Sequence, residues 1–423
     1  MMTARALIFT LLYVGSVLIL SAPSPNVSPL MANVAISTDE YMRQNPTWGQ
    51  AMAGPDRDKW LAADRKERDQ HIQKPTFILI PGGRAALPSG TRILPIKRQL
   101  RIKDSGEYKV RWVVLGNLDN NSGNTFAPTA CKKVVWLLYN VAILLGLNMQ
   151  WFDIKGAFMA EKPTRDIYVL IDDKVYMLNY SLYGLNDAPL IFNEGLVAHL
   201  NSGGYIQSQW DKCFFHKWIS TTRYAYVVFH VDDFTVTGTG QDIIDEFHRH
   251  LLSKYECTTN QDGIFLGTRC SRQPDGSMIF TKPYQMQNIF DKWLPGGLGT
   301  SKAPAEPMTA EYIKTLADES PACDKTGFKS LLGALLQLID VRPDIAYAIS
   351  KIAQRTESPR ITDMNALMQV VRYLYGTKNL GLRLRPGNVA YAWLLLKLRG
   401  FADCGYANHL NGKSQYYIGF DLV

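Results

Sequence analysis

Cysteine is scarce in this chain, and its few cysteines are widely separated. Six occur among 423 residues, and no two form a C-x-x-C pair. A zinc ribbon needs closely spaced cysteine pairs, and a small disulfide framework needs a much higher cysteine density. The scarcity therefore argues against both classes and favours a reducing compartment.

Long hydrophobic runs are also nearly absent. The one such run, residues 7–22, follows Arg5 as a secretory leader would. With about 17 mostly apolar residues it lies at the short limit for a spanning helix. One interpretation is a cleaved or anchored leader, with a membrane-anchored or secretory location and membrane association. The sequence favours the alternative, an incidental apolar terminus on a cytoplasmic protein.

An excess of charge or of polar residues is missing as well. The chain is 46% apolar and 20% charged, which excludes wholesale disorder, collagen and a coiled-coil rod. Its length predicts two or three packed units. The net charge of +8 is a modest excess that suits a polyanionic partner without requiring one.

Two segments near the N-terminus carry many charges. DRDKWLAADRKERDQHI, residues 56–72, predicts a surface helix that packs Trp60 and keeps its charges in solvent. A turn at Asp104-Ser105-Gly106 predicts a hairpin, and period-two alternation places Lys109 and Arg111 on one face, opposite Val110 and Trp112. This face is either a basic binding surface or the solvated side of a two-sided ribbon.

Three aspartates occupy places where a carboxylate needs an explanation. Asp153 lies inside the apolar strand-like segment NMQWFDIKGAF, where an unpaired charge costs several kcal/mol to bury. Asp232 and Asp233 lie at a predicted hairpin turn between two β-branched and aromatic runs. Aspartate also tolerates turn geometry, so the pair taken alone favours a purely structural turn.

The order of the elements predicts an α+β fold. Strands and helices alternate between residues 148 and 267, which suits an antiparallel sheet with helices on one face. Residues 328–384 have a helical pattern throughout, and residues 400–423 predict two strands around a turn. Three carboxylates on neighbouring strands of such a sheet are what a two-metal phosphoryl-transfer site requires.

Eight segments, in this order, carry a family resemblance: KVRWVVLGN, FAPTA, FDIKGAFM, SLYGLNDAP, FHVDDFTVTG, IFLG, LLGALLQLIDVRPDIAYAIS and VRYLYGT. They resemble the reverse transcriptase of copia-type long-terminal-repeat retrotransposons, a part of the Pol polyprotein. The resemblance extends from about Trp60 to the C-terminus.

The resemblance implies a right-hand polymerase with an RNase H-like start. Its expected parts are a leader and linker (1–34), an N-terminal extension (35–75), fingers (76–150), a palm (151–270), a thumb and connection (271–385) and the opening of an RNase H-like domain (386–423). Asp153 and Asp232 would bind Mg²⁺ or Mn²⁺, with Asp233 beside them. The nucleotide would contact Lys109, Arg111, Phe158, Tyr183 and Gly184, and the primer would contact a strand formed by Phe265, Leu266 and Gly267.

Four positions depart from the family pattern or complete it only in part. Asn186 and Asp187 replace the family's Lys-Gln pair, which would place a carboxylate near phosphates unless Asp187 serves only as a helix N-cap. His230 replaces an aromatic residue. Asp403 resembles the first metal ligand of RNase H, but no RNase H activity is expected.

The expected function is therefore RNA- and DNA-templated DNA synthesis. The expected partners are an RNA or DNA primer-template and deoxynucleoside triphosphates. By resemblance, the location would be a cytoplasmic virus-like particle or the nucleus. The alternative is a catalytically decayed retrotransposon remnant that at most binds nucleic acid, and Asp187 favours this alternative.

Overall fold

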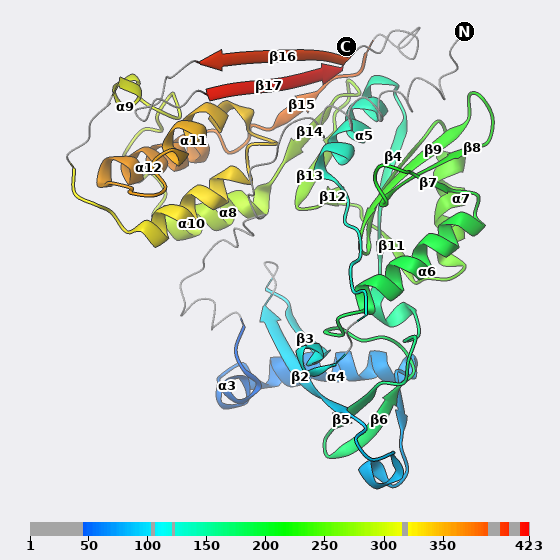
Figure 1. Ribbon diagram of the computed structural model, residues 1–423. Helices are drawn as coiled ribbons and strands as arrows, with labels where there is room; N and C mark the ends of the chain where they lie inside the picture. Colours follow the sequence, from blue (N-terminus) through cyan, green and yellow to red (C-terminus); the bar gives the residue numbers. More distant parts are fainter. Residues whose placement is uncertain are drawn as a thin grey trace.

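The computed structural model describes residues 45–102, 106–120, 123–314, 320–387, 398–405 and 415–422 (Figure 1). Within these ranges, no helix combines the length and the apolar character needed to cross a bilayer. Residues 7–22, with the leader and location predicted for them, lie outside the described residues.

The first unit is a five-stranded sheet with two helices packed on it. Its strand order is β1 (Phe77–Leu79), β6 (Lys174–Leu178), β5 (Tyr168–Ile171), β2 (Ile93–Ile102) and β3 (Tyr108–Val114). The predicted hairpin is confirmed, because β2 and β3 pair antiparallel with Arg101 opposite Lys109. Val110 and Trp112 are buried, whereas Lys109 and Arg111 are half-buried on the other face. A 3₁₀ turn, η1 (Gly83–Ala86), follows β1.

The two helices of this unit are α3 (Trp48–Ala53) and α4 (Arg57–Gln73). Trp60 of α4 is buried, as predicted. The prediction that the charges of α4 remain in solvent is wrong for Asp64 and Glu67, which are buried against β2 and β3. Charge periodicity could not reveal this burial, since the hydrogen-bond partners lie more than forty residues along the chain.

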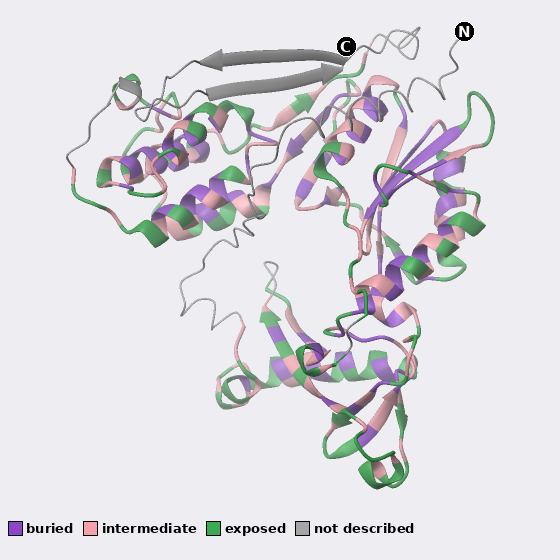
Figure 2. Cartoon of the chain, viewed as in Figure 1, coloured by how far each residue is buried: buried purple, intermediate pink, exposed green. Residues whose placement is uncertain are grey.

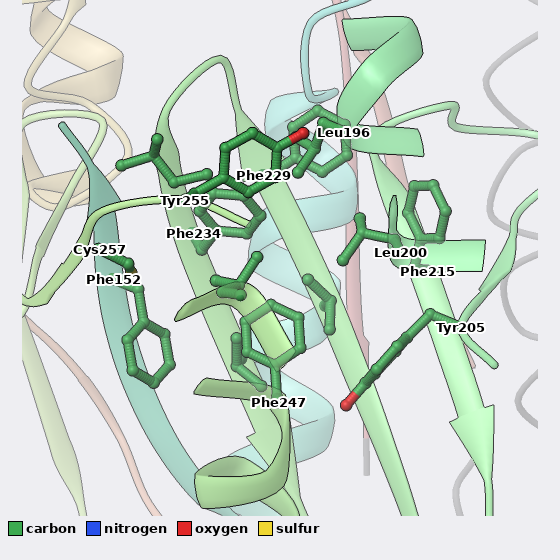
Figure 3. Close-up of a cluster of buried hydrophobic side chains, with 14 of the residues drawn as sticks. Phe152, Leu196, Leu200, Tyr205, Phe215, Phe229, Phe234, Phe247, Tyr255 and Cys257 are labelled. Carbon is green, nitrogen blue, oxygen red and sulfur yellow. The ribbon is translucent and has the colours of Figure 1, made fainter. Parts of the chain in front are cut away.

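The second unit is a six-stranded antiparallel sheet, seen at the upper right of Figure 1. Its order is β11 (Cys257–Thr259), β4 (Asn148–Ile154), β10 (Asp233–Gly238), β9 (Tyr224–His230), β8 (Phe214–Trp218) and β7 (Ile206–Gln207). Helices α6 (Ala188–Ser202) and α7 (Gln241–Leu252) cover one face. Figure 3 shows the buried cluster between them and the sheet, including Phe152, Phe234 and Phe247.

The opposite face of this sheet is covered as well. Helix α5 (Lys132–Leu144) packs against it, and Tyr139 Oη lies 3.3 Å from Thr235 Oγ1 of β10. The helix is apolar around most of its circumference because both the sheet and neighbouring elements contact it.

The third unit joins a small sheet to a helical bundle. The sheet has the order β12 (Ile264–Phe265), β13 (Thr268–Arg272), β14 (Met278–Thr281) and β15 (Leu382–Leu384). The helices, listed in chain order, are α8 (Pro283–Trp293), α9 (Ala310–Lys314), α10 (Lys325–Leu336), α11 (Ala346–Ala353) and α12 (Ile361–Gly376). In Figure 2 the buried residues of α8 and α10–α12 face one another.

The helical prediction for residues 328–384 is confirmed as far as Gly376 and wrong beyond it. Residues Leu382–Leu384 form β15, the edge strand of the small sheet. It pairs with β14, and Leu382 is the Cα partner of Phe280. The predicted C-terminal hairpin is present as β16 (Leu398–Gly405) and β17 (Gln415–Leu422).

The units are interleaved along the sequence. Strands β5 and β6 fall within the range expected for the palm, but they pair with β2 and β1 of the first sheet. The N-terminal extension is also part of that unit, since α3 and α4 contribute to its core. The predicted boundary at residue 150 between fingers and palm therefore does not coincide with the boundary between the two sheets.

Candidate active site

Two of the predicted carboxylates lie opposite each other on adjacent strands. Asp153 of β4 and Asp233 of β10 are direct Cα partners in the antiparallel ladder. Their neighbours Phe152 and Phe234 are buried on the side of α6 and α7, so alternation places both carboxylates on the other face. The sheet register alone therefore brings Asp153 and Asp233 together.

The third carboxylate, Asp232, belongs to the two-residue turn between β9 and β10. Its carbonyl oxygen accepts a 2.9 Å hydrogen bond from the amide of Ile154, which fixes the turn to the end of β4. The preceding Val231 has φ +59°, a left-handed conformation that β-branched residues rarely adopt. Such backbone strain costs about 1–3 kcal/mol and persists only where surrounding contacts impose it.

The pKa values of the three carboxylates reflect their shared surroundings. Burial and the negative charges of Asp232 and Asp153 raise the pKa of Asp233 to about 7. Burial and the charge of Asp232 also raise the pKa of Asp153, while Lys109 opposes that shift. Burial raises the pKa of Asp232, and the positive charges of Arg111 and Lys109 oppose it. The basic hairpin face is thus directed toward the carboxylates.

Arg111 is held beside a tyrosine. Its guanidinium carbon lies 5.0 Å from the ring centroid of Tyr183, within the range of a cation–π contact. Its Nε is buried and has no hydrogen-bond partner among the described residues. A half-buried guanidinium with an unused donor, close to Asp232, is suited to binding an anion.

Phe158, Tyr183 and Gly184 form the wall beside this arginine. The Phe158 and Tyr183 rings pack edge to face with centroids 5.4 Å apart. The Val114 amide donates a 2.8 Å hydrogen bond to the Tyr183 carbonyl oxygen. Gly184 has φ +91°, and a Cβ there would lie 2.1 Å from the Val114 carbonyl oxygen, so only glycine fits. The predicted nucleotide contacts therefore lie together.

Asp187 precedes α6, as predicted, but its side chain makes no capping hydrogen bond. Its carboxylate instead lies 3.4 Å from Arg165 Nη2, and Arg165 also pairs with Asp119. This guanidinium offsets the negative charge that the sequence placed near phosphates. Sequence reasoning missed Arg165, because no spacing rule links it to either carboxylate.

The predicted primer strand is corrected. Phe265 belongs to β12, whereas Leu266 and Gly267, with φ +50° and +73°, form the two-residue turn to β13. The Phe265 side chain is 1% exposed within a hydrophobic cluster, so it supports the turn and is not available to a ligand.

Asp403 lies on β16, with Tyr417 as its Cα partner. Its side chain falls outside the part that the structure describes, and its role stays a prediction.

Among the residues that the structure describes, no group of three or more histidine, cysteine, aspartate or glutamate side chains is arranged to hold a metal ion. The donor chemistry of the carboxylates nevertheless fits a hard divalent cation, which prefers carboxylate oxygens. The charge of Asp232 raises the pKa of Asp153, and the charges of Asp232 and Asp153 raise the pKa of Asp233, so the cluster repels further negative charge. A cation would relieve that repulsion.

The reverse transcriptase (RNA-dependent DNA polymerase) family matches residues 83–301, which hold all of the predicted catalytic and nucleotide-contacting residues. The chain is 26% identical over 364 residues to the Retrovirus-related Pol polyprotein from transposon RE2 of Arabidopsis thaliana, covering 83% of this chain and 24% of that protein. It is 23% identical over 377 residues to the corresponding protein from transposon TNT 1-94 of Nicotiana tabacum, covering 82% and 27%. The chain therefore spans about a quarter of the length of these relatives.

Among solved structures, a foamy viral protease-reverse transcriptase in complex with double-stranded DNA is similar at a TM-score of 0.45 and 14% identity. The match covers 85% of this chain and 54% of that one. The family match spans more than half of the sequence, and the relatives are Pol polyproteins of transposons. This chain belongs to the reverse transcriptase family, and within it to the copia type.

Proposed function

We propose that this chain catalyses template-directed addition of deoxynucleotides to the 3′ end of a primer, on RNA or DNA templates. The observation that carries the proposal is the register of Asp153 opposite Asp233, with Asp232 tied to the same strand end. Lys109 and Arg111 supply positive charge to the same place.

In the proposed reaction, the primer 3′-hydroxyl oxygen attacks the α-phosphorus of a deoxynucleoside triphosphate. A phosphodiester bond forms, the bond from the α-phosphorus to the oxygen that bridges it to the β-phosphorus breaks, pyrophosphate leaves with that electron pair, and the hydroxyl proton passes to solvent. Asp153 and Asp232 would hold Mg²⁺ or Mn²⁺, with Asp233 beside them. The cation would neutralise charge that develops on the phosphoryl oxygens.

The remaining roles fall to side chains around the carboxylates. Arg111 and Lys109 would bind the triphosphate, and burial of Arg111 Nε supports that role because a phosphate oxygen would satisfy it. Phe158, packed on Tyr183, would limit the space beside the sugar and exclude a ribose 2′-hydroxyl. Most of the rate would come from positioning and charge stabilisation.

We further propose how the three units correspond to a right-hand polymerase. The five-stranded unit would be the fingers, the six-stranded sheet with α5–α7 the palm, and the bundle α8–α12 the thumb and connection. The turn at Leu266 and Gly267 would approach the primer through its backbone.

The direct test is primer extension by the purified protein. A primed RNA template, deoxynucleotides and Mg²⁺ or Mn²⁺ should yield extended primer, and Asp232→Asn should abolish extension while leaving template binding intact. Removing one negative charge weakens capture of the cation but lessens repulsion of the phosphate backbone. Asp173→Asn is the matched control, since Asp173 is an exposed carboxylate in the β5–β6 turn. Template binding without extension by the native protein would instead support the decayed, binding-only alternative.

A further inference from the structure

Helix α4 precedes the part of the chain that matches the reverse transcriptase family, which begins at residue 83. It nevertheless contributes a buried carboxylate to the hairpin that carries Arg111. Glu67 is 5% exposed, and its Oε1 accepts a 3.1 Å hydrogen bond from the backbone amide of Trp112. Burying a glutamate costs free energy unless its carboxylate has a partner, so the burial of Glu67 against Trp112 needs a structural explanation.

The reason lies in the position of β3 at the edge of its sheet. Only β2 pairs with it, so alternate amides of β3 point away from the ladder and need other acceptors. Two consecutive outward amides have acceptors: Trp112 donates to Glu67, and Val114 donates to the Tyr183 carbonyl oxygen at 2.8 Å. Arg111 immediately precedes Trp112, the first of these two residues, and lies over the Tyr183 ring.

Further contacts make α4 a rigid support for this hydrogen bond. Asp64, one helical turn before Glu67, accepts hydrogen bonds from Trp112 Nε1 at 2.8 Å and from Arg98 Nε at 3.1 Å. His71, one turn after it, places Nε2 3.6 Å from Glu67 Oε1. The helix therefore holds both the backbone and the side chain of Trp112.

The electrostatics place Glu67 near the same wall of the site. Burial raises the pKa of Tyr183, the positive charge of Arg111 opposes that shift, and the negative charge of Glu67 adds to it. The charges of Glu67 and Arg111 thus both act on Tyr183, although Glu67 lies behind the hairpin and Arg111 on its opposite face.

We propose that Glu67 is a positioning residue, which fixes the backbone of β3 at Trp112 and thereby orients Arg111 toward the triphosphate of the incoming nucleotide. This inference rests on the proposed function. Glu67 contacts neither nucleotide nor primer, and acts only through the strand.

The test measures nucleotide affinity without requiring chemistry. Deoxynucleoside triphosphate is titrated into the full-length protein bound to a primer-template whose primer ends in a dideoxynucleotide. Glu67→Ala should weaken nucleotide binding about tenfold, as expected when a buried amide loses a charged acceptor. Glu67→Gln should restore affinity to within about threefold, because its amide oxygen can still accept from Trp112. If the alanine variant fails to fold, Glu67→Asp replaces it, since the shorter side chain cannot reach the amide.

Hydrogen exchange at the Trp112 amide supplies the second measurement. Exchange should accelerate in Glu67→Ala and return toward the native rate in Glu67→Gln. Leu100→Val is the matched control, because Leu100 is buried in the same core and pairs across the ladder with Val110, whereas Trp112 pairs with Arg98. It should leave both nucleotide affinity and Trp112 exchange within about twofold of native.

Unchanged nucleotide affinity in Glu67→Ala, or an equal loss in Leu100→Val, would overturn the inference. Absence of primer extension by the native protein, with nucleotide binding retained, would overturn the proposed function alone. Absence of nucleotide binding by the native protein would overturn both.

Discussion

Arg165, Asp119 and Asp187 form an ion cluster at the start of α6, and two substitutions in it should lower the free energy of unfolding by different amounts. Arg165 contacts both Asp119 and Asp187, and these two carboxylates are 9% and 7% exposed. Arg165→Met removes the shared guanidinium from two buried negative charges. Breaking a buried ion pair in this way costs about 3–5 kcal/mol.

Asp187→Gln should cost much less. Arg165 keeps Asp119 as its partner, and the 3.4 Å separation from Asp187 indicates a long hydrogen bond. We expect a loss of about 1 kcal/mol, the usual net value of one hydrogen bond. The substitution also restores the residue of the family pattern, yet we expect primer extension to stay within about twofold of native, because Arg165 already offsets the Asp187 charge.

Urea unfolding at pH 7 measures the free energies of both variants and of the double variant. Because the two residues are in contact, the double variant should lose less free energy than the sum of the single losses. A large increase in primer extension by Asp187→Gln, with unchanged stability, would refute this reasoning. It would show that the carboxylate repels the substrate's phosphates despite Arg165.

Three further outcomes are expected from other parts of the molecule. Arg111→Ala should raise the nucleotide KM at least tenfold with a smaller effect on primer-template affinity, measured by steady-state extension and gel shift. Gly184→Ala should destabilise the protein by about 2 kcal/mol or more in urea unfolding, because the new Cβ would meet the Val114 carbonyl oxygen in a left-handed backbone. Burial alone would raise the pKa of Asp344, but hydrogen bonds, chiefly from Arg342, outweigh it and lower that pKa. Asp344 therefore stabilises the fold above its unfolded pKa of about 3.9, and this contribution is lost as pH falls through the lower folded value. Asp344→Asn should cost about 2 kcal/mol at neutral pH and flatten the acid limb of a plot of stability against pH.

Local patterns predicted the parts of the site that lie within single elements. Alternation along residues 93–114 was sufficient to place Lys109 and Arg111 on one face, because side chains of a strand alternate whatever the strand pairs with. The apolar residues around Asp153 likewise identified a strand, and the hairpin at Asp232 followed from two β-branched runs.

Partners supplied from distant segments could not be predicted in this way. The charges of α4 have no strong amphipathic pattern, so nothing in the helix distinguished buried Glu67 from its exposed neighbours. Arg165 and β15 were missed for the same reason, since the identity of the opposing element decides whether a charge is buried or a short segment becomes a strand. The turn at Leu266 was mistaken for a strand because its left-handed conformation is unusual for leucine.

The interleaving of the first two units has a consequence for how the chain folds. Strand β2 can pair with β5 only after residue 171 has been synthesised, and β1 with β6 only after residue 178, although β4 of the other sheet comes before both partners. Contacts of such long sequence separation slow folding, because the entropy of loop closure must be overcome before they form. During synthesis, the β2–β3 hairpin and α4 can associate early, whereas the five-stranded sheet stays incomplete. A chain truncated before residue 168 should therefore expose the edge of β2 to proteases and chaperones, and one that extends past residue 171 should protect that edge.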